Sequence, residues 1–146
     1  MNNCQFSWPV RVYYEDTDAG GVVYHSNYLN FMERARTEWL RNLGYEQTEV
    51  KDKLGVIIVV HSLTINFKKP ARFNDMLEVK CELAEVRSSS IEMAQMIYCK
   101  GVVLIEAKIK AAFVDSKTFR PVAIPVEMKQ DMSKMQLISN LNMEKL

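Results

Sequence analysis

Apolar and polar residues alternate, or β-branched residues cluster, in five stretches of the chain, and both patterns predict β-strands. The predicted strands cover residues 6–15, 56–67, 77–83, 91–99 and 103–113, the last being the longest. Pro9 has no N–H group for a strand ladder, so we expect the first strand to begin at an edge of the sheet. Because the later strands have short connections, we expect consecutive strands to be antiparallel neighbours.

Between the first two strands the apolar period changes to three and four residues, which predicts an amphipathic helix beginning at about Asn27. Its apolar positions are Tyr28, Phe31, Met32, Ala35, Trp39 and Leu43. The polar positions are Glu33, Arg34, Arg36, Thr37 and Arg41. Gly44 stands where a left-handed C-terminal cap is expected. The polar composition of residues 45–53 predicts a short helical or irregular connection that ends at Gly55.

A single long helix must cover five strands, so the sequence predicts an α+β fold in which an antiparallel sheet curls around that helix. The length of 146 residues suits one domain over residues 1–146, with its core at about 5–125. Pro121 and Pro125 end the sheet region. The mixed segment 126–146 is expected to be a peripheral helix or a frayed tail.

Composition narrows the class of protein. The chain is 48% hydrophobic and 25% charged, with a net charge of +1, which is typical of a globular protein and not of a nucleic-acid binder. It has neither an apolar run of the roughly 20 residues that span a bilayer nor a signal-peptide pattern, so we expect a cytoplasmic location. The three cysteines Cys4, Cys81 and Cys99 form no CxxC pair, which favours neither a disulfide framework nor a zinc site.

The candidate chemistry lies in residues 16–28, where two acids, two glycines and a histidine precede the helix. Gly20 and Gly21 can adopt positive φ and let a ligand approach the backbone. Ser26 and Asn27 are suitable helix N-caps. Unpaired N–H groups at a helix N-terminus stabilise negative charge, so we expect a catalytic site here.

Two motifs carry a family resemblance. The segment Tyr14–Tyr28 (YEDTDAGGVVYHSNY), continued by Phe31–Arg36 (FMERAR), resembles the signature of hotdog-fold acyl-CoA thioesterases of the 4-hydroxybenzoyl-CoA thioesterase family. The nearest match is the YbgC-type branch associated with the Tol–Pal cell-envelope system. Residues 66–79 are similar to a second family segment, and the resemblance covers roughly residues 5–125. It implies a hotdog fold: a five-stranded sheet wrapped around one central helix.

The resemblance implies that Asp18 is the catalytic carboxylate, acting on the thioester either as a general base for water or as a nucleophile. The alternative is a purely structural role, in which Asp18 only closes an Asx turn. Asp16 is expected to be structural. His25 occupies the histidine position of the branch, where its backbone N–H, more than its ring, is expected to stabilise the oxyanion. A solvent-exposed histidine is the alternative.

Substrate-binding residues are also expected around this segment. Gly20 and Gly21 admit the thioester, while Tyr14 contacts the reacting group or packs against the helix, with packing slightly favoured. The phosphates of CoA need cations and hydroxyl groups at a rim. The candidates are Lys68, Lys69, Arg72, Arg87 and Ser88 with its neighbouring serines. A solvated basic loop is an equally weighted alternative.

The predicted function is hydrolysis of acyl-CoA to a carboxylic acid and free CoA, without metal or cofactor. Two alternatives stay open: a hotdog hydratase or dehydratase, and a non-catalytic module that binds acyl thioesters. The resemblance implies a homodimer or homotetramer with active sites at subunit interfaces. The cargo is acyl-CoA or an acyl-carrier-protein thioester, and partners among lipid-synthesis enzymes at the inner face of the membrane stay open as well.

Overall fold

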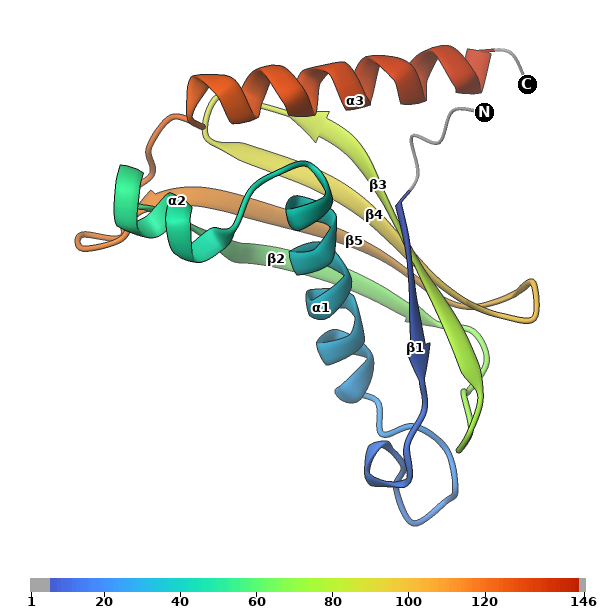
Figure 1. Ribbon diagram of the computed structural model, residues 1–146. Coiled ribbons are helices and arrows are strands. Elements are labelled where there is room, and N and C mark those ends of the chain that lie inside the picture. Colours follow the sequence, from blue (N-terminus) through green and yellow to red (C-terminus); the bar gives the residue numbers. More distant parts are fainter. Residues whose placement is uncertain (1–5, 145–146) are drawn as a thin grey trace.

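The fold of the computed structural model, which describes residues 6–144, is one sheet with three helices (Figure 1). In chain order the elements are β1 (Phe6–Arg11), α1 (Asn27–Asn42), α2 (Gln47–Leu54), β2 (Val56–Phe67), β3 (Met76–Val86), β4 (Ser90–Cys99), β5 (Val102–Asp115) and α3 (Val126–Glu144). A short 3₁₀ turn at Tyr14–Asp16 follows β1. The α+β prediction and all five predicted strands are confirmed, with β5 the longest at 14 residues.

The sheet has the strand order β1-β3-β4-β5-β2, and every neighbouring pair is antiparallel. The expectation that consecutive strands are neighbours holds for β3, β4 and β5 but is wrong for β2 and β3, which lie at different places in the sheet. The loop at residues 68–75 makes this crossover. Its Ala71 is fully buried, so the loop is held by packing instead of by a tight hairpin turn.

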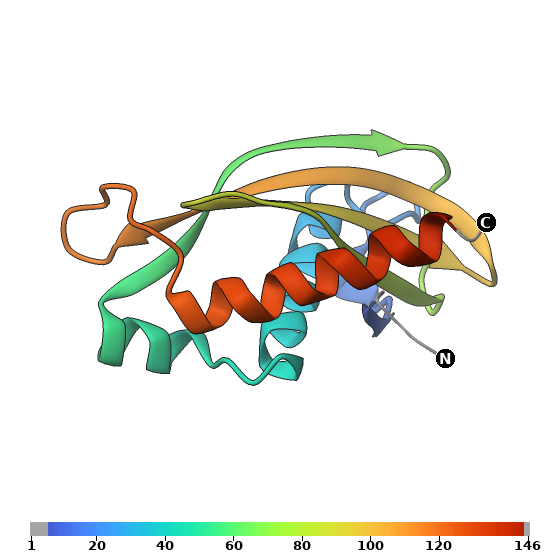
Figure 2. The same cartoon turned by 90° about the horizontal axis from the view of Figure 1, so that it is seen from above.

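All three helices lie on one face of the curved sheet (Figure 2). With the exception of Gln95, the buried inward side chains of the three central strands are apolar, and they are Leu77, Val79, Cys81, Leu83, Ile91, Met93, Ile97, Ile105, Ala107, Ile109, Ala111 and Phe113. They meet the apolar side of α1, where Phe31, Met32 and Ala35 are at most 1% exposed. The expected sheet wrapped around a central helix is therefore confirmed. Cys81 is buried in this core, and Cys99 is only partly buried.

The first strand is shorter than predicted, because β1 ends at Arg11 and residues 14–16 turn away. The carboxylate of Asp16 accepts the N–H of Tyr13 at 2.8 Å, which closes the 3₁₀ turn. Apolar alternation continues through Val12 and Tyr14, but the local hydrogen bond of Asp16 overrides it. The structural role expected for Asp16 is confirmed.

Helix α1 ends as predicted. Gly44 has a φ of +100°, and the N–H groups of Gly44 and Tyr45 donate to the carbonyls of Arg41 and Leu40, which is the Schellman pattern. Its beginning differs: Ser26 is the N-cap but is itself helical and makes no side-chain capping bond. Residues 47–54 form the short helix that was one of two expectations for this connection, and it ends at Gly55.

The C-terminal segment forms helix α3, and the first turns of this helix are not peripheral. In α3 the side chains of Met128 and Met132 are 1% and 0% exposed. Asp131 accepts a hydrogen bond from the hydroxyl of Tyr45, at 2.5 Å, and so links α3 to the end of α1. The predicted core boundary at residue 125 is therefore wrong: the core continues through the first turns of α3.

Candidate active site

The residues expected to carry the chemistry form a small hairpin before α1. Thr17 and Val23 make an antiparallel bridge, and the N–H of Asp18 donates to the carbonyl of Val22 at 2.9 Å. Gly21 has a φ of +82°, a conformation that residues with a Cβ rarely adopt. The hairpin therefore depends on glycine at its tip, with Asp18 at the base of the turn.

The carboxylate of Asp18 is exposed and partly engaged. Its Oδ1 atom accepts the N–H of Gly20 at 2.8 Å. This is the Asx turn that was expected if Asp18 had only a structural role. This bond fixes the direction of the carboxylate, while Oδ2 accepts no hydrogen bond from the described residues. One oxygen is thus held by the turn and the other faces solvent, so turn formation and chemistry are compatible.

The start of α1 lies directly beside this hairpin. The carbonyl of Asp16 accepts two hydrogen bonds from this region, from the N–H of Tyr24 at 2.9 Å and from the side-chain amide of Asn27 at 3.0 Å. The N–H groups of Asn27 and Leu29 are satisfied by nearby carbonyls. By contrast, the N–H of His25 meets no backbone acceptor within residues 6–144, so it remains a candidate donor for a ligand.

The imidazole of His25 is exposed and lies among aromatic rings. Its centroid is 4.5 Å from the ring of Tyr24 and 6.4 Å from that of Phe67, which belongs to β2. An open depression beside it is lined by His25, Tyr28, Phe67 and Lys69, among others. The site thus borders the outer edge of the sheet, since β2 is an edge strand.

Tyr14 does not pack against the helix, so that preferred expectation is wrong. It is 79% exposed because the 3₁₀ turn carries it away from the sheet, and its ring lies 5.4 Å from that of Phe73. Tyr14 and Asp18 line the same open surface depression, together with Tyr13, Glu15 and Thr17. The other expectation, contact with a reacting group, is therefore the one that its position allows.

The basic loop at residues 68–75 is attached to the hairpin. Val22 and Arg72 form an antiparallel bridge, and the N–H of Val23 donates to the carbonyl of Ala71 at 2.9 Å. Lys69 and Arg72 are exposed and therefore lie on the same end of the molecule as Asp18. Lys68 is 3.7 Å from a carboxylate oxygen of Glu106 and is partly neutralised.

Sequence reasoning overlooked how Tyr28 joins these parts. Its buried hydroxyl accepts the N–H of Ala71 at 2.9 Å, which ties α1 to the basic loop. Burial raises the pKa of Tyr28, and the carboxylates of Asp75 and Asp18 add to the rise against the opposing effect of the Ala71 hydrogen bond. The signal was available, because a buried tyrosine almost always has a hydrogen-bond partner.

Arg87 and Ser88 are not near this site. They follow the far end of β3, whose first residue Met76 is next to the basic loop and whose last residue is Val86. An 11-residue strand spans about 35 Å. The guanidinium of Arg87 is also paired, at 3.2 Å with Glu85 and at 2.7 Å with Glu92. Within one chain, the expectation that Arg87 and Ser88 join Lys69 and Arg72 at one rim is wrong.

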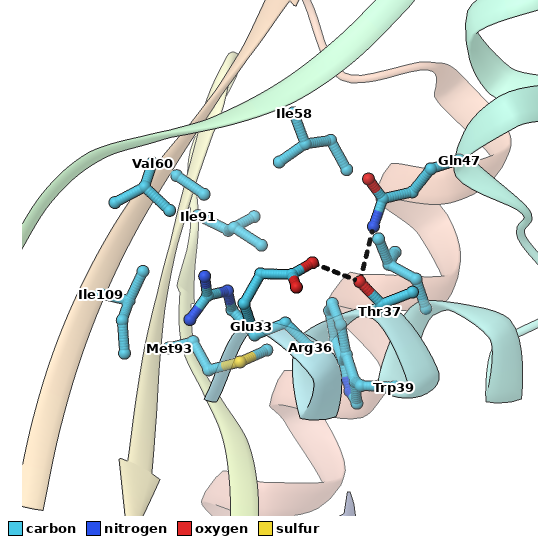
Figure 3. Close-up of a pocket in the computed structure, with 12 residues that line it drawn as sticks. Glu33, Arg36, Thr37, Trp39, Gln47, Ile58, Val60, Ile91, Met93 and Ile109 are labelled. Atoms are coloured by element: carbon cyan, nitrogen blue, oxygen red, sulfur yellow. Dashed lines mark hydrogen bonds between the residues drawn. The ribbon is translucent and has the colours of Figure 1, made fainter. Parts of the chain in front are cut away.

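A cavity lies between α1 and the sheet (Figure 3). It has a volume of about 120 Å³. Its polar lining residues are Glu33, Arg36, Thr37 and Gln47, and the rest are Trp39, Leu40, Ile58, Val60, Ile91, Met93, Ile109 and Ala111. Arg36 was assigned to the solvent face of the helix, yet it is half-buried and donates to Oε1 of Gln95 at 2.9 Å.

Two general features concern the described residues 6–144. They contain no group of three or more histidine, cysteine or acidic side chains placed to hold a metal ion. None of the helices in this range is both long and apolar enough to cross a membrane.

The chain is similar to known proteins over most of its length. A family model described as "Thioesterase-like superfamily" matches residues 12–132. The acyl-CoA thioesterase YbgC of Haemophilus influenzae is 46% identical over 124 residues, covering 85% of this chain and 91% of that protein. The acyl-CoA thioester hydrolase YbgC of Escherichia coli O6:H1 is 44% identical over 126 residues, covering 86% and 93%.

A solved structure agrees with these sequence matches. The crystal structure of a probable thioesterase from Bartonella henselae superposes with a TM-score of 0.80 at 32% identity, covering 83% of this chain and 99% of that one. The matched range ends at Met132, the second methionine of α3 that is buried in the core.

Proposed function

The chain belongs to the thioesterase-like superfamily, and from this premise we propose that it hydrolyses acyl-CoA thioesters to a carboxylic acid and free CoA. The observation that carries the proposal is the exposed carboxylate of Asp18, oriented by Gly20 beside the beginning of α1. A carboxylate beside a backbone N–H that has no backbone acceptor, here that of His25, suits attack on a thioester carbonyl.

In the proposed reaction Asp18 acts through its free Oδ2 atom. By one route it removes a proton from water as the water oxygen adds to the thioester carbonyl carbon. By the other, Oδ2 itself adds to that carbon and forms a mixed anhydride, which water then hydrolyses. In both routes the C–S bond breaks, the CoA thiolate leaves and takes up a proton, and the acyl group ends as a carboxylic acid.

The negative charge that develops on the carbonyl oxygen needs a donor. We assign this role to the N–H of His25, since no backbone acceptor in the described chain competes for it and it precedes the N-terminus of α1. The loss of one such donor typically lowers kcat by about 100-fold to 1,000-fold. The imidazole of His25, exposed beside the same position, is available to protonate the leaving thiolate.

The CoA moiety is proposed to lie along the basic loop. Lys69 and Arg72 carry exposed positive charges on a loop that is hydrogen-bonded to the hairpin of Asp18. Gly20 and Gly21 leave the backbone open for the thioester, and Tyr14 borders the approach. Arg87 and Ser88 have no part in this proposal for one chain, because they follow the far end of β3.

We propose that the working form is a homodimer joined through β2. This edge strand exposes the large apolar side chains Val60, Leu63 and Phe67, at 45%, 39% and 52%. An exposed apolar edge strand readily pairs with another chain. Because Phe67 adjoins His25, pairing along β2 would enclose the site. Sedimentation velocity at micromolar concentration tests this proposal, which a monomer would contradict.

The proposed place of action is the cytoplasm, where acyl-CoA or acyl-carrier-protein thioesters would be the cargo. An association with the Tol–Pal system and with lipid-synthesis enzymes is proposed only by resemblance to the YbgC branch. Co-purification from a native host would test this association, and absence of these partners from the purified protein would contradict it.

The direct test of the function is thiol release from a panel of short, aromatic and long acyl-CoA thioesters. Turnover of at least one panel member supports thioester hydrolysis. Loss of enoyl absorbance from crotonyl-CoA without thiol release would instead indicate a hydratase. Stoichiometric binding without turnover of any panel member would indicate a binding module.

A further inference from the structure

The cavity between α1 and the sheet is large enough for part of a substrate. Its volume of about 120 Å³ far exceeds the roughly 10–15 Å³ that one water needs on the same measure. Strands β2, β4 and β5 supply apolar walls, including Val60, Met93 and Ile109. Figure 3 shows the side chains of Glu33 and Arg36 entering this space from α1.

Arg36 brings a positive charge to these apolar walls without a carboxylate partner. Among residues 6–144 no acidic oxygen lies within 4.0 Å of its guanidinium, and its hydrogen bond goes to the neutral amide of Gln95. Burial lowers the pKa of Arg36, with Glu33 acting in the opposite direction, although the group stays charged. A half-buried guanidinium with unused N–H donors favours an anionic occupant.

Glu33 does not fill this role, because it forms no ion pair with Arg36 and one of its carboxylate oxygens is bonded to Thr37. Its Oε2 atom accepts the hydroxyl of Thr37 at 2.9 Å, and Thr37 also accepts the amide of Gln47 at 3.4 Å (Figure 3). Glu33 is exposed, whereas Arg36 reaches inward to Gln95 on β4. The two charges therefore point to different parts of the cavity.

The cavity and the reaction site are bordered by the same two elements, α1 and β2. Asn27, at the beginning of α1, and Arg36 are nine residues apart, or about 14 Å along a helix. The strand that gives Ile58 and Val60 to the cavity gives Phe67 to the surroundings of His25. A substrate whose carbonyl lies at His25 would therefore reach Arg36 by extending along α1 and β2.

We propose that this cavity binds the far end of the acyl group and that Arg36 selects acyl groups that end in a carboxylate. The substrate class is then the CoA monothioester of a straight-chain dicarboxylic acid of medium length. The guanidinium would bind the terminal carboxylate in a two-pronged arrangement, and the methylene groups would lie against the apolar walls. This inference rests on the proposed thioesterase function.

The test compares kcat/KM for matched pairs of substrates: succinyl-, adipyl-, suberyl- and sebacyl-CoA against butyryl-, hexanoyl-, octanoyl- and decanoyl-CoA. We expect the protein to prefer a dicarboxylic substrate over its neutral partner for at least one longer pair. Arg36→Met should lower kcat/KM for that dicarboxylic substrate by about tenfold or more, the worth of a charge-assisted hydrogen bond, and change its neutral partner much less.

Arg34→Met is the matched control, because Arg34 is exposed on the same helix and should leave both members of each pair unchanged. If Arg36→Met does not fold, Arg36→Lys keeps the charge but not the two-pronged geometry and should reduce the preference. Equal rates within every pair for the unmodified protein would overturn the inference while leaving thioesterase function intact. Absence of thiol release from all eight substrates would instead remove the function on which it rests.

Discussion

The substitution Gln95→Leu tests how the central helix is attached to the sheet. Gln95 is 0% exposed on β4 and makes three contacts: its amide donates to the carbonyl of Met32 at 3.0 Å and to Sγ of Cys81 at 3.1 Å, and its oxygen accepts from Arg36 at 2.9 Å. Leucine has a similar volume, so little cavity forms. The main loss is the hydrogen bond to a charged group, about 1.5–3 kcal/mol.

We therefore expect Gln95→Leu to lower the free energy of unfolding by about 2–3 kcal/mol, since it leaves the Arg36 guanidinium half-buried without an acceptor. Urea denaturation followed by circular dichroism measures this change. Gln130→Leu is the control, because Gln130 is exposed on α3 and the same substitution there should stay within about 0.5 kcal/mol.

A double variant tests whether Gln95 and Arg36 act as a pair. Combining Gln95→Leu with Arg36→Met removes both polar partners, so the double variant should be less destabilised than the sum of the single changes, by about 1 kcal/mol or more. Additive effects, or a Gln95→Leu protein within 0.5 kcal/mol of the original, would show that this buried contact does not hold α1 in place.

Four further predictions concern two glycines of the hairpin, the last helix and a buried thiol. Gly21→Ala should cost about 1–2 kcal/mol from its φ of +82° alone, since nothing lies within 4 Å of the added Cβ. Gly20→Ala should act mainly on kcat, because its Cβ would be 3.2 Å from Oδ1 of Asp18. Met132→Ala should lower the free energy of unfolding, measured by urea denaturation, by about 2–5 kcal/mol. A change near zero would contradict the burial of α3 in the core. Burial raises the pKa of the Cys81 thiol from 9.0 to about 11, so the folded state holds its proton where the unfolded state has lost it. Stability should fall between about pH 9 and pH 11, and Cys81→Ala should flatten that decline.

The sequence predicted the fold wherever one residue pattern decided the outcome. The spacing of apolar residues predicted α1 and all five strands, and Gly44 predicted the end of α1. It failed where a distant contact decided instead. The separation of β2 from β3 depends on the buried Ala71 in an otherwise polar loop, and the burial of α3 depends on two methionines that meet the rest of the core. A local pattern records neither contact.

The candidate site was predictable in part for the same reason. Asp18, Gly20, Gly21 and His25 are close in sequence, so their motif sufficed to group them. Arg87 was grouped with the site because it is basic, although the length of β3 carries it to the other end of the sheet. Arg36 was overlooked because helical period put it with the solvent-facing residues, whereas its long side chain turns inward to Gln95.

The measurement that tests the central claim most directly is thiol release by Asp18→Asn on the best acyl-CoA of the panel. Asparagine keeps an oxygen that can accept the N–H of Gly20, so the hairpin and the thermal unfolding midpoint should be preserved. The amide has neither the basicity nor the nucleophilicity of the carboxylate, and kcat should fall by about 100-fold or more while KM changes little. A folded Asp18→Asn protein with unchanged kcat would contradict the account, because no carboxylate at position 18 would then be needed for hydrolysis.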